Sequence, residues 1–175
     1  MATTQTTYAD AQPIGQPGAL ANSENWNAKT RSAGGNIGFG LPVVRSGDRT
    51  VVLMSSRAVV ATGAAGSPAP AGATITVVGT GGGQFEGIAK RDISVVHTTA
   101  DRYEQYDNIT VLDEGVIFGT AGATVTAGEQ AYWDEADSRY TNVTTDYFLP
   151  GVTFNTSAVD GGIVELRVRV PRAVA

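Results

Sequence analysis

Short runs of β-branched and aromatic residues, broken by glycine, place the strongest limit on how this chain can fold. They are most concentrated in residues 109–134, where the runs are Ile109–Leu112, Val116–Phe118 and Ala131–Trp133. Such residues favour strands, and the glycines between them favour turns. No window in this stretch places apolar residues at helical spacing over three turns. We therefore expect an antiparallel meander here, with a turn at Asp113–Gly115.

The closing stretch of the chain has the clearest strand pattern. Apolar side chains alternate with charged ones from position 163 onward: one face carries Val164, Leu166, Val168 and Val170, and the other carries Ile163, Glu165, Arg167 and Arg169. Side chains with a period of two lie on opposite faces of a strand. A turn is expected just before it, at Asp160–Gly162. Short strands at similar spacing recur from residue 35 onward, and they predict an all-β sandwich, jelly roll or barrel.

The first 35 residues have a different composition, dominated by Gln, Thr, Asn, Gly and Pro. Such a segment buries too little apolar surface to offset its ordering entropy. It nevertheless carries isolated large side chains, among them Tyr8 and Trp26. We expect an extended irregular arm at 1–35 and a β domain at 36–175. The arm is either a floppy tail or a docking segment, and removal of residues 1–30 is expected to leave a folded domain.

Composition excludes several functional classes. The 175 residues include no cysteine and one histidine, so thiol catalysis, disulfides and multi-histidine metal sites are excluded. A net charge of −5 argues against nucleic acid as the main partner. The first residues lack the basic and apolar regions of a secretory signal, and no apolar run is long enough to span a membrane. No cofactor is expected.

Three candidate chemical sites have simpler structural explanations. Gly79–Gln84 lacks the third glycine and the following helix of a dinucleotide loop, so a hairpin loop is favoured. His97 has no nucleophile-elbow sequence to serve, and a backbone-bonded histidine is favoured over a catalytic one. Asp134, Glu135 and Asp137 lack the spacing of an EF-hand, which favours a solvated turn over weak calcium binding.

The order of several motifs resembles the structural cement (decoration) proteins of tailed-bacteriophage heads. The motifs that carry the resemblance are Ile37–Val43, Gly83–Ala89, Tyr106–Ile117, Thr124–Tyr132 and Asp160–Val164. The resemblance covers residues 35–170. It implies an antiparallel β-sandwich of jelly-roll type that self-associates as a dimer or trimer. It also implies binding to the major capsid protein on the outer surface of the virion, across capsomer junctions, with no catalytic residues.

Under this interpretation the arm and one domain residue supply the contacts with the shell. We expect Tyr8, Trp26 and Phe39 to be the interaction anchors. Amphipathic aromatic side chains of this kind are frequent at protein interfaces.

A second hypothesis is a carbohydrate-binding β-sandwich module. Trp133, Tyr132 and Tyr140 would form its stacking platform, with calcium at Asp134 and Asp137. An enzyme centred on His97 is the third and weakest hypothesis.

Overall fold

The structure is a computed structural model that describes residues 15–22, 25–54, 84–92 and 101–171. The described residues contain strands and turns and no α-helix, which confirms the all-β prediction, and none of them forms a helix able to cross a membrane. The strands are β1 (Asn27–Ala33), β2 (Ile37–Gly38), β3 (Pro42–Arg45), β4 (Thr50–Leu53), β5 (Phe85–Ala89), β6 (Arg102–Tyr103), β7 (Asn108–Thr120), β8 (Gln130–Asp134), β9 (Arg139–Thr141), β10 (Tyr147–Phe154) and β11 (Ile163–Arg169).

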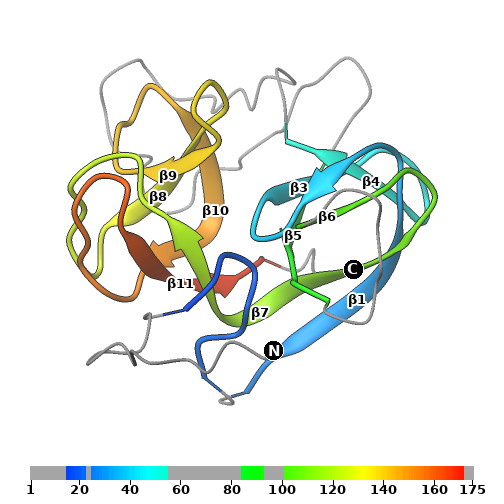
Figure 1. Cartoon of the computed structure of the whole chain (residues 1–175), viewed down its shortest axis with the longest axis horizontal. Coiled ribbons are helices and arrows are strands. Elements are labelled where there is room, and N and C mark those ends of the chain that lie inside the picture. Colours follow the sequence, from blue (N-terminus) through cyan, green and yellow to red (C-terminus); the bar gives the residue numbers. More distant parts are fainter. Residues whose placement is uncertain (1–14, 23–24, 55–83, 93–100, 172–175) are drawn as a thin grey trace, which may run out of the picture.

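Nine of these strands form one continuous sheet that is organised around β7. The strand order is β1-β4-β3-β5-β7-β11-β10-β8-β9, and β1 also pairs with β7. β1, β4, β3, β5 and β7 therefore close into a ring, which we call the first ring. In Figure 1, β1, β3, β4 and β5 lie on the right-hand side. β2 and β6 form a separate two-stranded sheet. The jelly-roll sandwich is not confirmed, because the pairings describe a barrel-like closed sheet instead of two stacked sheets.

The second half of the sheet also returns to β7. Past the end of β7, Ala121 forms a parallel bridge with Tyr140 of β9. The amide of Gly122 donates to the Tyr140 carbonyl at 2.7 Å. β7, β11, β10, β8 and β9 thus make a second, loosely closed ring, so β7 is shared by both halves (Figure 1).

The turn predicted at Asp113–Gly115 is wrong, because β7 runs unbroken through these residues. Glu114 and Gly115 pair with Arg169 and Val168 of β11, which extends the ladder across the expected break. Gly115 has a φ of 140° and allows the strand to bend without ending. The prediction for the last strand is confirmed: Val164, Leu166 and Val168 are buried, and the turn before it includes Gly161 at a φ of 74°.

Part of the expected arm belongs to the sheet. Residues 27–33 form β1, which pairs along β7 and, at its end, with β4. Residues 18–21 continue along the same edge of β7: the amide of Gly18 donates to the Phe118 carbonyl at 2.8 Å, and that of Ala21 to the Val116 carbonyl at 3.0 Å. The expectation of an irregular segment is therefore wrong for 27–33, and a truncation of residues 1–30 would cut through β1.

Two apolar cores fill the molecule. The larger is built from residues of both rings, most of them from the second, and includes Phe85, Trp133, Tyr140 and Phe154. The smaller consists of side chains from the first ring and from β2, β6 and the turn at Phe39: Ala33, Ile37, Phe39, Val43, Val51, Ala89, Tyr103, Ile109 and Val111. Two side-chain hydrogen bonds cross between the halves: Trp133 Nε1 donates to the Met54 carbonyl at 3.1 Å, and Tyr140 Oη to the Gly40 carbonyl at 2.6 Å.

Candidate interaction surfaces

The structure describes two of the three predicted anchors, Phe39 and Trp26, and they differ in exposure. Tyr8 lies outside the described residues. Phe39 is only 9% exposed; it packs edge-on against Tyr103 at 5.1 Å, and the Arg91 guanidinium lies 5.2 Å from its ring centre. Trp26 is 50% exposed. Phe39 therefore contributes to the smaller core in this structure, whereas Trp26 is available to a partner.

Trp26 lies beside a shallow cleft where β1 begins and β7 bends. The cleft measures about 330 Å³ and is lined by Asn25, Glu114, Gly115, Val116, Arg167, Val168 and Arg169. A Cβ at Gly115 would lie 3.0 Å from the Cβ of Trp26, so the glycine allows the chain at Trp26 to approach β7 closely. Arg167 and Arg169 project to solvent from β11. Tryptophan and arginine are the residues most enriched among interface hot spots. We call Trp26, Glu114, Arg167 and Arg169 the Trp26 surface.

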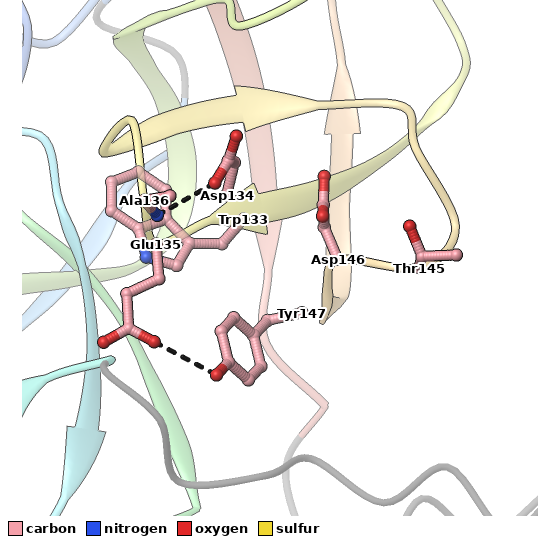
Figure 2. A pocket seen from close by; sticks show the side chains of 7 residues that line it. All are labelled: Trp133, Asp134, Glu135, Ala136, Thr145, Asp146 and Tyr147. Carbon is pink, nitrogen blue, oxygen red and sulfur yellow. Dashed lines mark hydrogen bonds between the residues drawn. The ribbon is translucent and has the colours of Figure 1, made fainter.

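A larger open cleft lies at the turn between β8 and β9 and is acidic (Figure 2). It measures about 640 Å³ and is lined by Trp133, Asp134, Glu135, Ala136, Thr145, Asp146 and Tyr147. Asp134 Oδ1 accepts hydrogen bonds from the amides of Ala136 and Asp137, at 2.9 and 3.4 Å. Figure 2 shows Glu135 pointing away from the two aspartates to reach the Tyr147 hydroxyl, at 3.0 Å. The carboxylates thus shape the turn.

Burial and the negative charge of Asp134 raise the pKa of Asp146 above its usual range. The cleft therefore disfavours additional negative charge. Within the described part of the chain, no three His, Cys, Asp or Glu side chains converge to hold a metal ion. The calcium site of the carbohydrate hypothesis thus has no ligand set there.

The aromatic platform of the same hypothesis is wrong. Trp133 and Tyr140 are each 1% exposed and pack edge to face at 5.1 Å in the larger core. Tyr132 is half-buried against Phe148. A sugar cannot stack on rings that are already covered by protein. Sequence alone could not reveal this burial, because the covering residues come from strands distant in the chain.

A group of five charged residues occupies one end of the first ring. The Glu86 carboxylate, 4% exposed, lies 3.7 Å from Lys29 Nζ and 3.4 Å from Arg31 Nη2, and also contacts Arg45. Asp113, 2% exposed, lies 2.9 Å from Lys29 Nζ. Each buried carboxylate is therefore matched by cations from neighbouring strands, as burial of charge requires. These residues tie the ring together, and both carboxylates are buried and paired. Sequence reasoning did not identify this group.

Tyr106 lies in the loop between β6 and β7. It is 79% exposed, more than any other large apolar side chain in the described part of the chain. His97 lies outside the described residues. The exposed large side chains Trp26 and Tyr106, together with the internally paired charges, are the pattern of a binding or structural protein.

Comparison with known proteins agrees with this class. Residues 4–169 match the model of the bacteriophage structural cement protein family (E217 gp24/Pam3 gp6), and the chain belongs to this family. The fold is similar to a chain in the solved structure "The capsid of Myoviridae Phage XM1", with a TM-score of 0.65 and 13% sequence identity. That match covers 97% of this chain and 98% of the other. A search of curated proteins found no match.

Proposed function

We propose that this protein is a structural capsid cement protein that binds the outer surface of a phage head, across capsomer junctions, and stabilises the shell. The observation that carries the proposal is the family match over residues 4–169. The similarity to a chain of the XM1 phage capsid supports it at the level of the fold. The proposed partner is the major capsid protein, and the proposed assembly is a homodimer or homotrimer on the virion. No enzymatic activity is proposed.

The fold favours docking through side chains over addition of a strand. An exposed sheet edge can recruit a partner strand. Here β1 pairs with both β4 and β7, and β9 returns to the end of β7 through Tyr140. Because both halves of the sheet close on β7, the described strands offer little free edge. The Trp26 surface is the proposed contact, with Tyr8 as a proposed second anchor in the segment before it.

Stabilisation by such a protein follows from mass action. A ligand that binds the assembled shell and not its separated subunits adds about 4 kcal/mol per site at a thousandfold excess over its Kd. Many copies on one shell make the sum large, even when each contact is modest. The rigid, closed sheet suits this role, because little ordering of the domain is needed on binding.

The test is cosedimentation of the purified protein with undecorated shells of its phage. The wild-type chain should pellet with shells at a fixed ratio to the major capsid protein and should raise the temperature of shell disassembly. Trp26→Ala should weaken binding at least tenfold, the size expected for removal of a hot-spot residue. Val159→Ala is the matched control, because Val159 is also exposed, at 68%, and lies in the turn before β11, at the opposite end of that strand from Arg167 and Arg169.

A second variant addresses the proposed division at residue 35. A chain that begins at Gly15 keeps every described strand and the pairing of residues 18–21 with β7. It should remain folded, and it should bind shells more weakly if Tyr8 is an anchor. Equal shell binding by this chain and the wild type would refute the docking role of residues 1–14. Failure of the wild-type chain to bind shells would refute the proposed function itself.

A further inference from the structure

Tyr106 combines two properties that rarely occur together: an unfavourable backbone conformation and high exposure. Its φ is 75°, in the left-handed region that bulky side chains seldom adopt. Its side chain is 79% exposed, so the ring buries little surface within the chain. Asparagine or glycine would adopt this conformation with less strain. The fold itself therefore gains little from tyrosine at this position.

The loop that carries Tyr106 is held firmly in place. The Tyr106 amide donates to the Ala33 carbonyl at 2.7 Å, and the Ala33 amide donates to the Asp107 carbonyl at 2.9 Å. Within the loop, the Glu104 amide donates to Asp107 Oδ2 at 2.5 Å. These bonds join the turn between β6 and β7 to the end of β1. The ring is thus presented from a fixed backbone, which lowers the entropy lost on binding.

Among the residues that the structure describes, those beside Tyr106 carry few large side chains. Gly34, Gly35 and Asn36 connect β1 to β2 next to this loop, and Gln105 Nε2 reaches the Gly34 carbonyl at 3.5 Å. A side chain at Gly35 would meet nothing within 4 Å, and Asn36 is exposed. A partner can therefore approach the backbone closely on this side.

We propose that Tyr106 is a further contact point for the shell protein, separate from the Trp26 surface, and that its ring inserts into an apolar recess on the shell. This inference rests on the proposed function. Backbone strain kept at an exposed site is typical of binding and switch regions. Tyrosine supplies a large ring and a hydroxyl with few rotatable bonds, which suits a protein recess that has a polar group at its base.

The position of Tyr106 relative to Trp26 favours a bridging role. Trp26 precedes the first residue of β1, and Tyr106 is bonded to its last residue, Ala33. A strand of this length spans about 20 Å at roughly 3.3 Å per residue. Two aromatic contacts at this separation on one rigid strand can engage two different sites on the shell. Simultaneous attachment at two points raises the overall affinity without strengthening either contact.

A second copy of the chain is a less suitable occupant. A symmetric dimer contact is made by one surface with itself. The two clefts described above are lined by residues of β7 to β11 and of the segment before β1, and neither lies beside Tyr106. Insertion of Tyr106 into one of them would give a head-to-tail contact, which forms rings or open filaments. The shell surface has no such restriction.

The test is shell binding by Tyr106→Asn, with Ser138→Asn as the matched control. Ser138 is also exposed and has a φ of 53°, so both variants place asparagine at a left-handed position. Neither variant should lower Tm, and relief of strain should raise the Tm of Tyr106→Asn by up to about 3 °C. Tyr106→Asn should bind shells about thirtyfold more weakly, the effect expected for a hot spot. Ser138→Asn should bind shells as the wild type does.

Several outcomes would overturn the inference while leaving the proposed function intact. One is wild-type shell binding by Tyr106→Asn when the wild-type chain itself binds. Another is loss of self-association without loss of shell affinity per copy, which would assign Tyr106 to a contact between copies. A fall in Tm of more than about 5 °C would assign it a structural role. If the wild-type chain does not bind shells, the proposed function fails first.

Discussion

The hydroxyl of Tyr140 offers a direct test of how the two halves of the sheet are joined. It donates a 2.6 Å hydrogen bond to the Gly40 carbonyl, which lies between β2 and β3, while Tyr140 itself lies in β9. Tyr140→Phe removes the hydroxyl and keeps the ring that packs on Trp133. The buried Gly40 carbonyl then loses this donor, which costs about 1–3 kcal/mol. We expect a loss of about 2 kcal/mol in the free energy of unfolding.

For a chain of this length such a loss lowers Tm by about 4–8 °C. Urea unfolding followed by tryptophan fluorescence and by circular dichroism measures the change. Tyr147→Phe is the control, because its hydroxyl bonds the Glu135 carboxylate at 3.0 Å in a partly exposed site. It should cost about 0.5 kcal/mol or less. If Tyr140→Phe costs no more than the control, the hydrogen bond does not join the two halves as described.

Three further predictions follow from buried groups. Glu86→Gln should lower the free energy of unfolding, measured in urea, by about 2 kcal/mol. The loss is smaller than for a fully buried ion pair because the cations that contact Glu86 are partly exposed, and an unchanged urea midpoint would contradict the prediction. Gly87→Ala should lower the free energy of unfolding by about 3 kcal/mol or more, because its Cβ would lie 2.1 Å from the Leu112 carbonyl oxygen. At Gly128 a Cβ meets no atom within 4 Å, so the control Gly128→Ala should cost about 1 kcal/mol, and equal losses for the two variants would refute the steric argument. Burial raises the pKa of Tyr103 to about 12, so the stability that depends on its protonated hydroxyl is fully present well below pH 10, and about 2 kcal/mol of it is lost by pH 12. Tyr103→Phe should lose less stability over that range, and parallel pH curves for the two proteins would disprove this prediction.

The family was predictable from the order of short motifs, and the all-β class from local pattern. The alternation of Val164, Leu166 and Val168 with charged residues was sufficient for the last strand, since a two-residue period is a property of the strand itself. The turn at Gly161 was also predictable from local sequence, because a turn residue at positive φ is most easily a glycine. The cement protein family was likewise inferred from sequence, and the family match confirms it.

The tertiary structure alone decided which aromatic residues are exposed and how the sheet closes. Trp133, Tyr140 and Phe39 are buried by residues from strands far away in the sequence, whereas Tyr106 stands exposed on a loop joined to β1. Asp113–Gly115 has a turn-like sequence but continues β7, because β1 and β11 pair with it there. Local preferences are small compared with a full set of ladder hydrogen bonds and buried contacts, so long-range pairing determines both the strand and the surface.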